Sequence, residues 1–282
     1  MVIQDKRYLL NLEQFCGCCG ETLLREAFGR LDGERRRKTL PMKNAAVKAA
    51  STGAGLLVQK ALRDYISGQM TAEALPEIQC FSVEELLSAV GDTVIEPCYK
   101  YGGNGKPYFT DYPFYFNLSH SGQYVFCGVS GREIGVDIQK VQKADELRLA
   151  KRFFSEEEYT ALEGCKEQEI RRQMFFRMWT RKEAYGKLTG HGLTGAIGKD
   201  FWTGNSEEHI SGTVISGEKI MGMEAQKEGI PETGVHKKEV PGLKALDKKL
   251  MWEEYDVLPD YKIACVTRFT DFEDTAVQHY VG

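Results

Sequence analysis

Residues 135–139 read Gly-Val-Asp-Ile-Gln, and residues 179–187 read Trp-Thr-Arg-Lys-Glu-Ala-Tyr-Gly-Lys. In the first stretch, Ile134, Val136 and Ile138 alternate with glycine, Asp137 and Gln139. This period of two predicts a strand with the aliphatic side chains on one face. Asp137 and Gln139 share the opposite face.

The second stretch predicts a helix that begins near residue 169. In a helix, Trp179, Glu183 and Lys187 follow one another at steps of four along one stripe, with Lys182 one position round. A carboxylate and two ammonium groups facing Asp137 are more charge than a core tolerates unpaired. A divalent cation and an anionic ligand complete such a set, and oxygen ligands of this kind suit Mg²⁺.

Gly-Val-Asp followed at a distance by Trp-x-x-Lys-Glu-Ala-x-x-Lys resembles the signature pair of the 4′-phosphopantetheinyl transferases, in particular the larger single-chain type that activates synthases of secondary metabolism. The resemblance implies that coenzyme A is the substrate and that an apo acyl or peptidyl carrier protein is the partner. The phosphopantetheine arm passes to a serine hydroxyl, and adenosine 3′,5′-bisphosphate is released.

The resemblance also implies roles for individual residues. Asp137, Gln139 and Glu183 are the expected metal ligands, for Mg²⁺ or alternatively Mn²⁺. The expected catalytic residues are Glu183, Lys182, Lys187 and His120. Glu183 acts as a ligand, as the base, or as both, and Lys182 holds either a phosphate or Glu183. Gln139 departs from the family, in which many members have glutamate there, and its neutral oxygen predicts weaker metal binding.

Basic residues of the first half are expected to bind the nucleotide of coenzyme A. Arg35 and Lys38 lie in the run Glu-Arg-Arg-Arg-Lys at 34–38, where the family grips the 3′-phosphate. A solvated face and a nucleic-acid patch are the other interpretations of such a run. Family members often have an arginine where this chain has Ser51, and Lys48 is the expected substitute.

Two further strings match the family. Gly-Lys-Pro at 105–107 implies that Lys106 and Pro107 lie against the adenine and phosphates of coenzyme A. Asn-Leu-Ser-His-Ser at 117–121 implies that Ser119 and His120 reach the diphosphate, with Lys187 beside them. If the resemblance is set aside, the first string is most simply interpreted as a glycine-rich turn. The histidine of the second string is then most simply interpreted as structural.

The order of predicted elements indicates an α+β fold of two similar halves, 1–132 and 133–282. Predicted antiparallel strands are 114–122 with 124–129, and 250–257 with 261–267. A long helix is predicted over 43–66, in which Gly53 and Gly55 indicate close packing. The resemblance implies pseudo-symmetric halves, each an antiparallel sheet packed with helices, and a site in the cleft between them. Residues 203–249 are polar and predict a long, mobile insertion.

Composition narrows the function classes. The formal net charge of the chain is −4, so the protein as a whole does not attract the negatively charged backbone of nucleic acid. No signal peptide and no membrane-spanning run are evident, so we expect a cytoplasmic protein that binds neither nucleic acid nor membrane. We expect a monomer, because both halves of the cleft that the resemblance implies lie in one chain. The eight cysteines, three of them at 16, 18 and 19, are expected to be reduced thiols. The alternatives are a non-catalytic regulatory protein that binds coenzyme A and an enzyme restricted to fatty-acid carriers.

Overall fold

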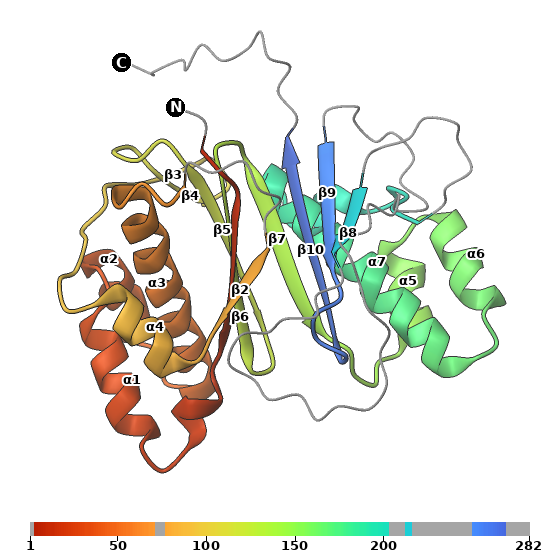
Figure 1. Cartoon of the computed structure of the whole chain (residues 1–282). Helices are drawn as coiled ribbons and strands as arrows, with labels where there is room; N and C mark the ends of the chain where they lie inside the picture. The colour runs from red at the N-terminus through yellow and green to blue at the C-terminus, as the bar shows by residue number, and fades with distance from the viewer. Residues whose placement is uncertain (1–2, 71–76, 203–211, 216–249, 269–282) are drawn as a thin grey trace, which may run out of the picture.

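Two four-stranded sheets pack against each other, and each carries helices on its outer face (Figure 1). The computed structural model describes residues 3–70, 77–202, 212–215 and 250–268. In Figure 1 the helices of the first half lie to the left of the strands and those of the second half to the right. The described residues therefore form four layers in the order helices, sheet, sheet, helices.

The first sheet has the strand order β2-β1-β6-β5, and the second has the order β7-β10-β9-β8. The helices and strands of the first half are β1 (Lys6–Asn11), η1 (Glu13–Cys16), α1 (Gly20–Gly29), α2 (Gly33–Thr39), α3 (Ala45–Ile66), β2 (Ile78–Phe81), α4 (Val83–Val90), β3 (Tyr99–Tyr101), β4 (Pro107–Phe109), β5 (Tyr115–Ser121) and β6 (Tyr124–Ser130). Those that follow are β7 (Ile134–Lys140), α5 (Glu146–Phe153), α6 (Glu156–Gly164), α7 (Gln168–Thr189), η2 (Leu193–Ala196), β8 (Gly212–Ile215), β9 (Leu250–Tyr255) and β10 (Tyr261–Arg268).

The α+β class predicted from the sequence is confirmed, and most of the strand pairing is antiparallel. Two of the four edge strands of these sheets are different: β2 is parallel to β1, and β8 is parallel to β9. The chain reaches β2 after the helices α1 to α3, and such a crossover returns it in its original direction. The predicted boundary at residue 132 falls in the turn between β6 and β7, where the chain passes from one sheet to the other.

Hydrophobic side chains divide the core by layer. One cluster lies between the first sheet and α1, α3 and α4, and includes Tyr8, Leu56 and Val125. A second lies between the two sheets and includes Phe126 and Val136. Two more bury the inner faces of α5, α6 and α7. The alternation predicted for 134–138 is therefore real, and its aliphatic face packs against the first sheet.

Several local predictions are confirmed. The predicted helices at 43–66 and from 169 are α3 and α7, and the predicted hairpins are β5–β6 and β9–β10. A methyl group on Gly53 would lie 2.7 Å from Leu10, and one on Gly55 would lie 2.4 Å from Leu31, so both glycines mark close packing. The predicted insertion 203–249 lies outside the described residues except for Gly212–Ile215, which form β8.

The helix α7 lies directly on β7 because Gly135 has no side chain. A Cβ at Gly135 would lie 2.1 Å from the carbonyl oxygen of Ala184 and 2.4 Å from the amide nitrogen of Leu188. This contact fixes the distance between the strand of Asp137 and the helix of Glu183 and Lys187. Gly190, with φ of 73°, takes the left-handed conformation that ends α7.

We predict that Gly135→Ala lowers the free energy of unfolding by about 3 kcal/mol, because backbone of α7 must move away from β7. Gly29→Ala at the end of α1 is the control, since a Cβ there meets no atom within 4 Å. Urea unfolding measures both variants. Equal stability of the two variants would contradict the close contact.

Within the described residues, every helix is too short or too polar to cross a lipid bilayer.

Candidate active site

Side chains of β5 join the two sheets. β5 and β7 are edge strands of different sheets. Side-chain oxygens of β5 accept hydrogen bonds from backbone amides of β7, in place of the backbone carbonyls of a neighbouring strand. Asn117 Oδ1 accepts from the backbone amide of Val136 at 3.0 Å, and Ser121 Oγ accepts from that of Lys140 at 2.9 Å. Ser119, midway between them on the same face, donates from Oγ to Asp137 Oδ1 at 2.6 Å. We call these three contacts the β5–β7 seam.

The seam and α7 bring together the predicted residues around Asp137. Lys187 Nζ donates to Asp137 Oδ1 and to Ser119 Oγ, both at 2.7 Å. Gln139 Nε2 donates to Asp137 Oδ2 at 3.0 Å. The Asp137 side chain is only 2% exposed, whereas that of Lys187 is 27% exposed, so the cluster is open to solvent on the side of α7.

Glu183 lies close enough to Asp137 for their charges to interact. Burial and the charge of Asp137 raise the pKa of the Glu183 carboxyl, and Lys187 offsets only part of this effect. Burial and the ammonium of Lys187 lower the pKa of His120, at the exposed end of β5. The space between the two carboxylates is therefore one where added positive charge is favourable.

Lys182 does not lie with this cluster, although the sequence predicted a catalytic role for it. Its Nζ lies 2.8 Å from Glu158 Oε2, and both side chains are fully buried. It also donates to the carbonyl oxygens of Ala196 and Lys199. The Glu158 carboxylate accepts from the amides of Ser155 and Phe201 at 2.9 Å.

The reason for this placement is the helical rotation of about 100° per residue, which turns position 182 away from Asp137 when position 183 faces it. Lys182 thus fixes α7 to the start of α6 and to the chain after η2. Burial lowers the pKa of Lys182 and raises that of Glu158, so the pair depends on mutual contact.

The predicted nucleotide residues of the first half lie on α2 and α3. Lys38 Nζ is a donor to the hydroxyl of Tyr101 and lies 4.2 Å from the centre of its ring. Arg35 is in the first turn of α2, where its amide donates to Asp32 at 2.9 Å. Lys48 lies 5.8 Å from the ring centre of Phe28.

The hairpin of β3 and β4 connects α2 to the Asp137 cluster. Tyr101 of β3 pairs with Pro107 of β4, so Lys38 and Pro107 lie at the same hairpin. The next residue, Lys106, donates from Nζ to the carbonyl oxygens of Ile134 at 2.9 Å and Leu188 at 3.1 Å. Burial lowers the pKa of Lys106. A row of basic side chains thus runs from α2 to the point where β7 begins and α7 ends.

Sequence reasoning missed Asn117, Tyr101 and Glu158. Asn117 was part of the quoted motif, and its spacing of two from Ser119 and Ser121 is the signal that places all three on one face. Tyr101 bonds to Lys38, and Glu158 bonds to Lys182. Both partners are more than twenty positions away in the sequence, so no local pattern indicates either contact.

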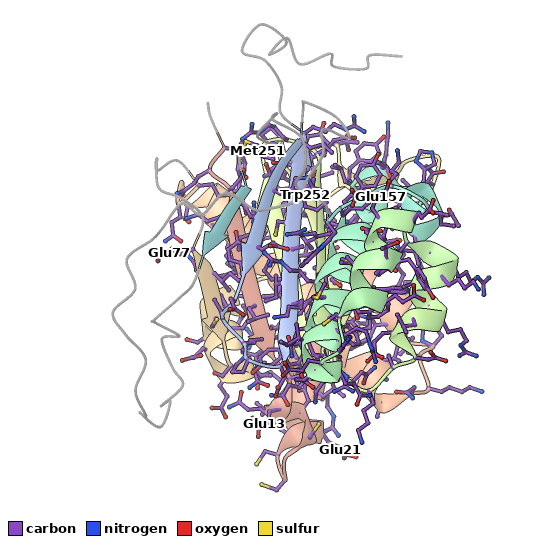
Figure 2. All side chains as sticks on the ribbon, turned by 90° about the vertical axis from the view of Figure 1, so that its right-hand side faces the viewer. Glu13, Glu21, Glu77, Glu157, Met251 and Trp252 are labelled. Carbon is purple, nitrogen blue, oxygen red and sulfur yellow. The ribbon has the colours of Figure 1, made fainter. Side chains whose placement is uncertain are left out.

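The cysteine cluster is remote from this chemistry. Cys16, Cys18 and Cys19 are exposed free thiols, and Sγ of Cys18 lies 3.9 Å from Sγ of Cys19. They lie between Glu13 and Glu21, at the end of the molecule opposite Met251 and Trp252 (Figure 2). In the parts of the chain that the structure describes, no group of three or more His, Cys, Asp or Glu side chains is arranged to hold a metal ion.

Two carboxylates, an amide and an ammonium beside a row of basic residues define a site for phosphate chemistry. Residues 133–224 match the family model described as the 4′-phosphopantetheinyl transferase superfamily. This segment contains Asp137, Gln139, Glu183 and Lys187. The resemblance recognised from the two motifs is therefore confirmed over that segment.

Curated relatives agree with this assignment. The chain is 40% identical over 98 residues to 4′-phosphopantetheinyl transferase gsp of Aneurinibacillus migulanus, 44% over 95 residues to psf-1 of Bacillus pumilus, and 42% over 91 residues to Sfp of Bacillus subtilis strain 168. The matched parts are 35%, 33% and 32% of this chain. They span 40%, 39% and 40% of the lengths of these relatives.

We predict that Lys182→Met destabilises the fold by about 3 kcal/mol, because it leaves the buried carboxylate of Glu158 without a partner. The double variant Lys182→Met with Glu158→Gln should recover part of this loss. Urea unfolding at neutral pH measures both. A single variant as stable as the unmodified chain would show that Lys182 has no such structural role.

Proposed function

We propose that this protein transfers the 4′-phosphopantetheine arm of coenzyme A to a serine hydroxyl of an apo acyl or peptidyl carrier protein. The observation that carries the proposal is the cluster of Asp137, Glu183 and Lys187, held between the two halves of the chain and inside the segment that matches the superfamily. The curated relatives named above are 4′-phosphopantetheinyl transferases, which supports the same reaction.

The reaction replaces a phosphoanhydride bond of the diphosphate with a phosphodiester bond to serine. The serine oxygen bonds to the diphosphate phosphorus that carries the pantetheine arm. The bond from that phosphorus to the bridging oxygen breaks, and adenosine 3′,5′-bisphosphate leaves with the electron pair. The serine proton passes to a base, and negative charge builds on the phosphate oxygens.

Mg²⁺ fits the residues of the site. Asp137 and Glu183 supply two carboxylates, and the side-chain amide of Gln139, whose nitrogen donates to Asp137 Oδ2 in this structure, lies beside Asp137. Burial, and after it the nearby charge of Asp137, raises the pKa of the Glu183 carboxyl, and a divalent cation bound between the two carboxylates would favour their charged forms. When bound, the ion supplies positive charge to the phosphate oxygens.

The chain's own residues perform the remaining tasks. Lys187, which bonds to Asp137 and Ser119, offers a positive charge to a phosphate oxygen at this point. Glu183 is suited to accept the serine proton, because a carboxylate with a raised pKa is a stronger base. His120 in β5 lies close enough to Lys187 and Asp137 to interact with their charges, and its ring N–H can donate to a phosphate oxygen.

The row of basic residues supports the placement of the nucleotide. Lys38 and Pro107 meet at the β3–β4 hairpin, and Lys106 reaches the junction of β7 and α7. A coenzyme A molecule lying along this row would have its 3′-phosphate near Lys38 and Arg35, and its diphosphate near Lys187. This arrangement makes the two sheets the two walls of the site. The repeated order of strand, helices and hairpin in each half supports pseudo-symmetric halves.

Intact mass of an apo carrier protein tests the reaction directly. After incubation with this protein, coenzyme A and Mg²⁺, the carrier should gain one phosphopantetheine, roughly 340 Da. Glu183→Gln should slow the transfer by about 100-fold or more, because it removes both the proton acceptor and a metal ligand.

Glu163→Gln is the matched control, since Glu163 lies on α6 and bonds to Tyr159. It should transfer at the unmodified rate. Coenzyme A binding without any mass gain on several carriers would instead favour the non-catalytic regulatory protein.

A further inference from the structure

The segment between β1 and α1 carries three thiols that the proposed function does not use. Residues 16–19 read Cys-Gly-Cys-Cys, and all three cysteines are exposed free thiols. Sγ of Cys18 lies 3.9 Å from Sγ of Cys19, close enough for direct contact. We call residues 16–19 the thiol loop.

The backbone closes the thiol loop and holds its base. A Cβ at Gly20 would lie 2.2 Å from the carbonyl oxygen of Phe15, so the two residues that flank the loop touch. The Gly20 amide also donates to the carbonyl oxygen of Gly17 at 2.9 Å. Just before the loop, the Leu12 amide donates to the carbonyl oxygen of Gln123 at 2.8 Å. The three thiols are therefore kept together in one closed turn at the surface.

The other five cysteines are placed differently. Cys127 and Cys265 are buried, and burial raises the pKa of both thiols, to about 12 for Cys127. Burial also raises the pKa of Cys80 to about 11, and Cys165 donates to a backbone carbonyl. Because the thiolate is the reactive form, thiols of such high pKa are inert. Cys98 is exposed, but within the described residues no sulfur contact joins it to a second thiol.

Within the thiol loop, Cys16 and Cys19 are the better partners for a disulfide. Disulfides usually join residues whose Cα atoms are about 4.4–6.8 Å apart, whereas the Cα atoms of adjacent residues such as Cys18 and Cys19 are about 3.8 Å apart. Cys16 and Cys19 begin and end the loop, and the contact between Phe15 and Gly20 brings those ends together. The contact between Cys18 and Cys19 instead allows one thiol to displace a group bound to the other.

We propose that the thiol loop is a thiol–disulfide exchange site that takes small-molecule disulfides and closes to a Cys16–Cys19 disulfide. The Cys19 thiolate attacks one sulfur of the small disulfide, so a mixed disulfide forms and the first small thiolate leaves and takes up a proton. The Cys16 thiolate then attacks the Cys19 sulfur, and the second small thiolate leaves in the same way. Two protein thiols and one small disulfide thus give one protein disulfide and two small thiols.

Cys18 provides a second entry to the same product. A small thiol that attaches to Cys18 can be displaced by Cys19, whose Sγ lies 3.9 Å from that of Cys18. Cys16 then attacks Cys19 and frees Cys18. The loop therefore keeps no adduct, whereas Cys98, which the described residues provide with no neighbouring thiol, keeps the small thiol that binds it. This chemistry does not depend on the proposed function.

Oxidised glutathione is the probe for this exchange. The full chain is incubated with it at neutral pH, the remaining free thiols are alkylated, and the peptides are identified by mass spectrometry. Cys16 and Cys19 should escape alkylation and appear in a peptide that is lighter by two hydrogen atoms and carries no glutathione. Cys98 in the same sample should carry a glutathione adduct, which shows that the reagent is active.

Two serine variants separate the roles of the thiols. Cys16→Ser removes the last attacking thiol, so glutathione should remain on the loop. Cys18→Ser is the matched control, because it keeps both final partners and should still close without an adduct. Both positions are exposed, so urea unfolding of the two variants should match that of the unmodified chain.

Four results would overturn the proposal. They are glutathione retained on the loop of the unmodified protein, a disulfide between two copies of the chain, adduct-free closure of the Cys16→Ser variant, and full alkylation of Cys16 and Cys19 at a concentration of oxidised glutathione that modifies Cys98.

Discussion

The three contacts of the β5–β7 seam are the constraint on which the site depends. Two edge strands of different sheets lie side by side, and Asn117 and Ser121 satisfy backbone amides of β7 that have no ladder partner there. Ser119 uses the intermediate position to hold the Asp137 carboxylate. The same seam thus joins the sheets and orients the acid, because one face of β5 serves both purposes.

The position of α7 is the second condition, and several separate contacts set it. Gly135 allows backbone-to-backbone packing on β7, Arg181 binds Glu254 of β9, and Lys182 binds Glu158 of α6. Buried ion pairs of this kind fix geometry more than they add stability. These three contacts hold α7 in the position in which Lys187 bonds to Asp137 and Glu183 lies near it.

Much of this arrangement follows from short-range patterns. The alternation at 134–139 and the steps of four from Trp179 predict elements that the structure contains. The grouping of Asp137, Gln139, Glu183 and Lys187 also follows from them. Periodicity could not assign Lys182, because adjacent helical positions face different neighbours, and the pairing with Glu158 depends on how α6 packs. The parallel strands β2 and β8 were missed because each is short and its partner is set by the tertiary fold.

Amide hydrogen exchange measured by NMR tests the seam most directly. If Asn117 and Ser121 hold β7, then Asn117→Ala should speed exchange at Val136 by tenfold or more, and Ser121→Ala should do so at Lys140. Amides of β7 that face β10 should keep their protection in both variants. Unchanged exchange at Val136 and Lys140 would contradict the account, since β7 would then be held in place without the side chains of β5.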